Sequence, residues 1–156
     1  MTEKDQALAG VVGYPVRLMD APGRNRSLIR LQTASVLVVD DNVLLASVMR
    51  RRLSSQGLRV VTVGSVVEAH RIFESFRVGI FDIELGDGCG VDLAEYLSDW
   101  GIVSHVVFFT GGAAATSLAR AHRLGEVFMK SADVTPLERR VLELARKPQS
   151  SMRSAT

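Results

Sequence analysis

Short apolar runs alternate with segments of helical periodicity along most of the chain. The first run, Val36–Val39, fits a buried strand, and the apolar positions after it recur on one helix face that Gly57 is placed to end: Leu45, Val48, Met49 and Leu53. Four more strands are predicted at residues 59–63, 78–82, 105–110 and 126–130. The other helices are predicted from residue 65 through Ile72 and Phe73, over 90–100, over 113–125 and from residue 135 onward. Five strands alternating with five helices indicate a doubly wound α/β domain, whose parallel sheet carries helices on both faces.

Two of the predicted helices begin with capping signals. Ser65 is followed three residues later by Glu68, and Thr135 by Glu138, which is the spacing of a capping box. Pro136 then falls at the first helical position, where its missing N–H removes no hydrogen bond. We therefore expect Ser65 and Thr135 to cap their helices.

The two ends of the chain differ from this alternating core. Helix and strand breakers run through residues 1–34 at a spacing that leaves no room for a long element: Gly10, Gly13, Pro15, Pro22 and Gly23. We expect an N-terminal extension over 1–34 that is flexible or only locally ordered, one domain over 35–147, and a disordered tail over 148–156.

Composition excludes several classes of protein. With 156 residues, of which 47% are hydrophobic and 23% charged, the chain has the size and make-up of a globular domain. A net charge of +2 is too small to indicate nucleic-acid binding. The single cysteine, Cys89, excludes an intramolecular disulfide, and no apolar run reaches the roughly 18 residues that cross a bilayer. We expect a cytoplasmic protein without membrane or nucleic-acid partners.

Polar side chains stand where four of the five predicted strands end. Asp40 and Asp41 follow the first strand, Asp82 ends the third, Thr110 the fourth and Lys130 the fifth. Ligands of doubly wound sheets bind at the carboxyl ends of the strands, so these side chains are expected to meet at one edge. Crowded carboxylates repel one another, and a hard divalent cation such as Mg²⁺ relieves that repulsion. The sequence therefore predicts a magnesium site at this edge.

The ordered set of motifs at these strand ends resembles the receiver domain of two-component response regulators. It consists of the acidic pair in "VVDDN", the aspartate in "GIFDIELGDGCGVDL", the threonine in "VVFFTGG" and the lysine in "VFMKSAD". The resemblance covers about 113 residues, from the first strand through the last helix. It implies the flavodoxin-like strand order 2-1-3-4-5.

The resemblance also implies a role for each residue of the site. Asp82 would accept a phosphoryl group from a histidine kinase or a histidine phosphotransfer protein. Asp41 and Asp82 would bind Mg²⁺ directly, Asp40 through water, and Glu84 through its carbonyl. Thr110 and Lys130 would contact the phosphoryl oxygens. The Glu84 carboxylate, two residues past Asp82, is expected to affect the lifetime of the phosphorylated state.

The family further implies how phosphorylation is read by a partner. Thr110 would draw its loop inward and repack the face of the fourth helix, fifth strand and fifth helix, which binds a downstream protein or forms a homodimer. The switch aromatic of the family lies three residues before the lysine, where this chain has Val127, with Phe128 next to it on the opposite face of the strand. The family's proline after the lysine, which follows a cis bond, is Ser131 here.

Three classes of function remain open. The first, which we expect, is a phosphoaccepting receiver that promotes only its own phosphorylation and dephosphorylation and carries no output domain after Ala145. The second is a phospho-independent pseudo-receiver that acts as a protein–protein interaction module, which Ser131 and Val127 favour. The third is a phosphohydrolase of the haloacid-dehalogenase type, which "FDIELGDG" resembles faintly. That family needs a second aspartate where this chain has Glu84.

Overall fold

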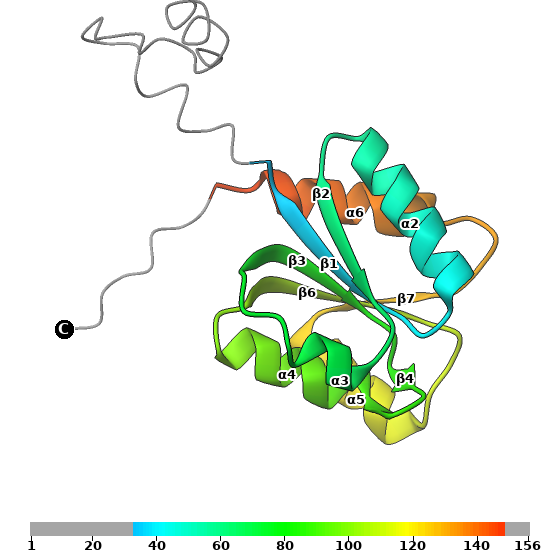
Figure 1. Ribbon diagram of the computed structural model, residues 1–156. Coiled ribbons are helices and arrows are strands. Elements are labelled where there is room, and N and C mark those ends of the chain that lie inside the picture. Colours follow the sequence, from blue (N-terminus) through cyan, green and yellow to red (C-terminus); the bar gives the residue numbers. More distant parts are fainter. Residues whose placement is uncertain (1–32, 149–156) are drawn as a thin grey trace, which may run out of the picture. The chain divides into compact units, whose positions relative to one another are not determined.

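Five parallel strands form the central sheet in the order β2-β1-β3-β6-β7 (Figure 1). The computed structural model describes residues 33–148. The strands of the sheet are β1 (Ser35–Val39), β2 (Arg59–Val63), β3 (Phe76–Phe81), β6 (Val103–Thr110) and β7 (Glu126–Met129). This order confirms the predicted one. The chain winds outward in opposite directions from β1 and β3, so the switch point, where such sheets bind ligands, lies between these two strands.

Helices cover both faces of the sheet, as the layers in Figure 1 show. One face carries α2 (Val43–Ser55) and α6 (Thr135–Arg146), and the other carries α3 (Val66–Ala69), α4 (Gly90–Asp99) and α5 (Ala115–Leu124). The apolar run of β1 serves both layers, because Val36 and Val38 pack toward α2 and α6 while Leu37 and Val39 pack toward the other three helices. This two-sided burial explains why the first strand is apolar throughout instead of alternating with polar residues.

A small hairpin between β3 and α4 was not predicted. β4 (Glu84–Leu85) pairs antiparallel with β5 (Gly88–Cys89), and Gly86 and Asp87 form the turn between them. Two-residue strands are too short to leave a hydrophobic pattern in the sequence. The hairpin follows Asp82 directly, and it therefore determines what surrounds that carboxylate.

Helix α3 is shorter than predicted. It was expected to continue through Ile72 and Phe73, but it ends at Ala69. The amides of Arg71 and Ile72 bond to carbonyls three residues back, which closes a tight turn. Ile72 then packs into the core, whereas the side chain of Phe73 is 90% exposed. The helical periodicity was misread because Phe73 is apolar without being buried.

The two predicted caps have different outcomes. The Ser65 side chain accepts a hydrogen bond from the amide of Glu68, so the cap of α3 is confirmed. The cap at Thr135 was wrong, because α6 begins at this residue and its side chain makes no capping bond. The Asp133 carboxylate accepts from the Thr135 amide instead, and the Glu138 carboxylate pairs with Arg52 of α2. Glu138 thus pairs with a residue of another helix instead of capping its own helix.

Three aromatic rings cluster on the outside of α3 and α4, with His70 edge-on to Tyr96 and Tyr96 tilted against Trp100. The ring of Tyr96 lies 4.8 Å from that of His70 and 6.0 Å from that of Trp100, measured between centroids. Trp100 is the only tryptophan of the chain, and its side chain is 71% exposed. This aromatic cluster is separate from the buried core and lies at the surface.

The expectations for the chain ends lie almost entirely outside the described residues. Of the predicted extension over 1–34 the structure describes only residues 33 and 34, and of the predicted tail over 148–156 only residue 148. Within residues 33–148, no helix combines the length and the apolar character needed to span a membrane.

Candidate functional site

Asp40 and Asp82 stand side by side at the carboxyl ends of β1 and β3. Val39 is in register with Phe81, so the residues that follow them are neighbours. The ladder continues one step beyond the strands, because the Asp82 amide donates to the Val39 carbonyl at 2.9 Å. This frame holds the side chains of Asp40 and Asp82 in buried positions, with exposures of 5% and 9%. The predicted meeting of these strand ends is confirmed.

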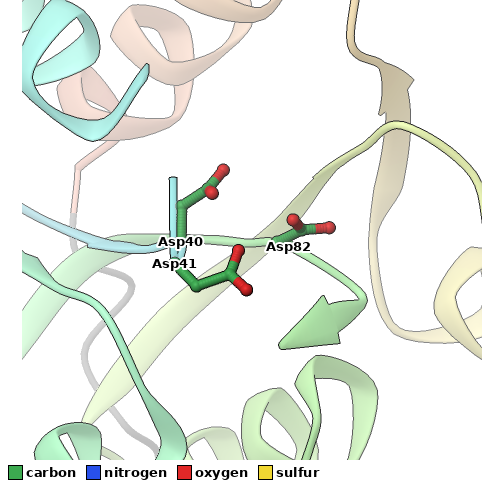
Figure 2. A group of neighbouring side chains, drawn as sticks. All are labelled: Asp40, Asp41 and Asp82. Carbon is green, nitrogen blue, oxygen red and sulfur yellow. The ribbon is translucent and has the colours of Figure 1, made fainter. Parts of the chain in front are cut away.

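Asp41 completes a cluster of three carboxylates, which Figure 2 shows gathered from the two strand ends. One carboxylate oxygen from each of Asp40, Asp41 and Asp82 lies within 4.8 Å of the others. Asp40 and Asp82 are buried, whereas Asp41 is exposed to solvent. Oδ1 of Asp40 accepts the amide of Asn42 at 2.8 Å, which helps to fix that side chain. Carboxylate oxygens that converge on one solvent-accessible position are the ligands that Mg²⁺ prefers.

Lys130 supplies the positive charge of the site. Its Nζ atom lies 2.6 Å from Asp82 Oδ2 and 2.9 Å from Asp40 Oδ2. Partial burial alone would lower the pKa of this ammonium, but its hydrogen bonds to Asp40 and Asp82, together with their charges, raise the pKa on balance. One ammonium faces three carboxylates, so the cluster retains an excess of negative charge that a divalent cation can balance.

The ammonium of Lys130 reaches the carboxylates of Asp40 and Asp82 although the next residue is Ser131 and not proline. The amide of Lys130 donates to the Thr110 carbonyl at 2.8 Å, which extends the pairing of β6 with β7 to the lysine itself. No cis peptide bond occurs within residues 33–148, so the bond between Lys130 and Ser131 is trans. The Ser131 hydroxyl donates to the Asp133 carbonyl at 3.0 Å. The departure from the family's lysine–proline pair therefore leaves the ammonium at the carboxylates.

The Thr110 side chain is fully buried and points into its own loop. Its hydroxyl donates to the Gly112 carbonyl at 3.1 Å. Beside it lies an open depression of about 440 Å³, whose walls come from the ends of β3 and β7, the start of β4 and the loop after β6: Asp82, Glu84, Gly111, Gly112, Ala113 and Lys130. A phosphoryl-sized group on Asp82 has room in this depression. Glu84 is exposed at its rim.

The predicted switch residues lie on opposite faces of β7. Val127 packs toward the layer of α3, α4 and α5, and Phe128 packs toward the layer of α2 and α6. Both side chains are partly buried. Their placement on the two faces confirms the strand alternation, and neither belongs to the depression beside Asp82.

Sequence reasoning missed two residues that shape the site. Gly90 begins α4 directly behind Asp82, and a Cβ there would lie 1.7 Å from the Asp82 carbonyl oxygen. Asp87, in the hairpin turn, accepts hydrogen bonds from the amides of Val66 and Val67. The only sequence signal for either was the glycine-rich stretch "LGDGCG", which indicates a tight turn but not what the turn contacts.

Replacing Asp41 with asparagine is expected to raise the free energy of unfolding by about 1 kcal/mol in metal-free buffer, because it removes one of three mutually repelling carboxylates. Millimolar Mg²⁺ should raise the Tm of the wild type by binding the folded state, and should raise that of the variant less. Thermal denaturation with Mg²⁺ or EDTA measures both effects. Asp99→Asn, at the exposed end of α4, is the control. An undiminished Mg²⁺ response in Asp41→Asn would contradict a metal site that uses this carboxylate.

Comparison with known families agrees with this geometry. The family model described as the response regulator receiver domain matches residues 36–140, well over half of the chain. The chain belongs to this family. It is a receiver domain, a signalling module of two-component systems and not an enzyme in the usual sense. The comparison with curated protein sequences finds no match.

Solved receiver structures share the fold. The response regulator TrrA of Thermotoga maritima, in complex with Mg²⁺ and a beryllium fluoride, superposes with a TM-score of 0.64 at 22% identity, covering 72% of this chain and 99% of that one. The non-phosphorylated HemR receiver domain of Leptospira biflexa gives 0.66 at 24% identity, covering 75% and 98%. A CheY-like receiver from Methanospirillum hungatei gives 0.62 at 21% identity, covering 72% and 94%.

Proposed function

We propose that this receiver accepts a phosphoryl group on Asp82 from a histidine kinase or a histidine phosphotransfer protein, within a two-component system or phosphorelay. The observation that carries the proposal is the 2.6 Å contact of Lys130 Nζ with Asp82, inside a carboxylate cluster and beside an open depression. Phosphoryl transfer depends mainly on a positioned nucleophile and on fixed positive charge at the transferred group. Asp82 and Lys130 offer both.

Each side chain has a defined part in the transfer. A carboxylate oxygen of Asp82 would attack the phosphorus while the bond from phosphorus to the donor's imidazole nitrogen breaks, and the imidazole would leave with that electron pair. Lys130 would hold a phosphoryl oxygen. The Thr110 hydroxyl would exchange the Gly112 carbonyl for a second phosphoryl oxygen. That exchange exists only in the phosphorylated state, so it can shift the equilibrium between two conformations of the loop.

The donor atoms suit a bound Mg²⁺. Asp41 and Asp82 would be direct ligands, Asp40 would act through water, and the Glu84 carbonyl would complete the protein ligands. When bound, the ion supplies charge neutralisation at the phosphoryl oxygens. The excess of carboxylates over ammonium groups in the cluster supports this assignment.

The output would pass to another protein. We propose that the face of α5, β7 and α6 binds a downstream protein target, or a second copy of the chain, after Thr110 moves. Val127 and Phe128 connect β7 to the two helical layers, and Met129 is exposed at its end.

The reaction would take place in the cytoplasm, where a reduced Cys89 is stable.

The experiment is intact-mass spectrometry after incubation with acetyl phosphate and Mg²⁺. A single phosphoryl adduct is expected on the wild type and on the control Asp99→Asn. None is expected on Asp82→Asn or when EDTA replaces Mg²⁺. An adduct that persists in Asp82→Asn contradicts the assignment of this residue.

A phospho-independent interaction module is the second candidate function, because Ser131 and Val127 differ from the family pattern. It would be favoured if neither acetyl phosphate nor a phosphorylated histidine kinase labels the wild type. The double change Ser131→Pro with Val127→Tyr would then test whether these two positions prevent phosphorylation.

A further inference from the structure

Asp87 joins the hairpin after Asp82 to the start of α3. Its Oδ1 atom accepts the amide of Val66 at 2.9 Å, and its Oδ2 atom accepts the amide of Val67 at 3.1 Å. These are the first two amides of α3, which have no partner within the helix. The two amide bonds lower the pKa of the Asp87 carboxyl, so it is ionised at neutral pH. Both oxygens of the Asp87 carboxylate, which belongs to the hairpin, are thus bonded to α3.

The hairpin fastened by Asp87 lies against the carboxylate cluster. A Cβ at Gly86 would lie 3.6 Å from Asp41 Oδ2, and a Cβ at Gly88 would lie 3.0 Å from Cγ2 of Val66. The turn is bonded to α3 through Asp87, and it lies close enough to Asp41 that a Cβ at Gly86 would be in van der Waals contact with that carboxylate. Glu84, at the start of the same hairpin, is on the rim of the depression beside Asp82.

We propose that Asp87 is a positioning residue: by binding α3 it holds the hairpin that carries Glu84, and so limits the access of water to phosphorylated Asp82. The proposal rests on the proposed phosphorylation of Asp82. Two-residue strands provide little pairing of their own, so the hairpin depends on its contacts with the rest of the domain. Without the Asp87 carboxylate, the turn would lose its two longest-range hydrogen bonds.

The test is the decay of the phosphorylated state, followed by intact-mass spectrometry after acetyl phosphate is removed. Asp87→Ala is expected to decay at least about threefold faster than the wild type. Asp87→Asn retains one carbonyl oxygen that can accept an amide, and it should decay at an intermediate rate.

Asp133→Ala is the matched control. Asp133 accepts the amide of Thr135 at 2.9 Å, so it supports the start of α6 as Asp87 supports the start of α3, but away from the hairpin. Its loss is expected to leave the decay rate unchanged. Equal acceleration by Asp133→Ala and Asp87→Ala would show a general loss of structure and would overturn the positioning role.

A double-mutant cycle with Glu84→Gln tests whether Asp87 acts through Glu84. If it does, Asp87→Ala should accelerate decay less in the Glu84→Gln background than in the wild type. The full threefold effect in both backgrounds would overturn the role of Glu84. A wild type that accepts no phosphoryl group refutes the proposed function itself, whereas phosphorylated Asp87→Ala with the wild-type decay rate refutes only the positioning role.

Discussion

Replacing Gly90 with alanine is expected to lower the free energy of unfolding by about 3 kcal/mol and to abolish phosphorylation of Asp82. The added Cβ would lie 1.7 Å from the Asp82 carbonyl oxygen, 2.8 Å from its carbonyl carbon and 3.2 Å from Cα of Ile83. All three are backbone atoms, so no side-chain rotation can relieve the overlap. The Gly90 amide also donates to the Ile83 carbonyl at 2.7 Å, which holds the start of α4 close to this segment. Either the helix or the phosphoacceptor must move.

Urea denaturation followed by far-UV circular dichroism measures the loss in Gly90→Ala, and acetyl phosphate labelling measures the loss of function. Gly64→Ala is the matched control, because a Cβ there would lie 3.9 Å from its nearest neighbour, a carboxylate oxygen of Glu68. The control is expected to unfold within about 0.5 kcal/mol of the wild type and to be labelled normally. A Gly90→Ala protein as stable as this control would contradict the close approach of α4 to Asp82.

Replacing Lys130 with methionine is expected to lower the free energy of unfolding by about 2 kcal/mol in metal-free buffer and to prevent stable phosphorylation. Methionine preserves much of the buried stem but removes the charge, so Asp40 and Asp82 would remain buried without a counter-ion. Arg59→Met is the control, because it breaks the ion pair with Glu74, in which both side chains are nearly half exposed, and it should cost less than about 1 kcal/mol. Comparable losses in the two variants would show that Lys130 contributes no more than a surface charge.

The pH dependence of the Lys130→Met defect follows from its pKa. The pKa of Lys130 is raised in the folded state, so its stabilising contribution is complete below the pKa of an unfolded lysine and declines only as the pH rises through the raised value. The difference between wild type and variant should therefore stay constant across neutral pH. It should shrink only under strongly alkaline conditions, which denaturation curves at several pH values would show.

The sequence was sufficient for the sheet and for the carboxylate cluster because both depend on local patterns. The apolar run Val36–Val39 can be buried only in a strand with a helical layer on each side, and parallel strands must bring Asp40 and Asp82 to one edge. The same rule places Lys130 at this edge, and its contact with the carboxylates depends in addition on the strand order, which the resemblance to receiver domains implied.

The parts that could not be predicted depend on contacts between distant segments. Asp87 binds amides about 20 residues away, and Glu138 binds Arg52 of another helix instead of capping its own. The close approach of Gly90 to the Asp82 carbonyl is likewise invisible in a stretch that already contains several glycines. Phe73 misled the helix assignment because an apolar residue at helical spacing is usually buried.

The exposed position of Trp100, beside Tyr96, makes the intrinsic fluorescence of this protein a surface signal. The single indole is largely in water in the folded state, so its emission should change little when the core unfolds. The same exposure makes it accessible to a collisional quencher such as acrylamide. Because Trp100 follows the last residue of α4 and Gly90 begins that helix behind Asp82, quenching could report optically whether α4 shifts when the site is filled, without any added label.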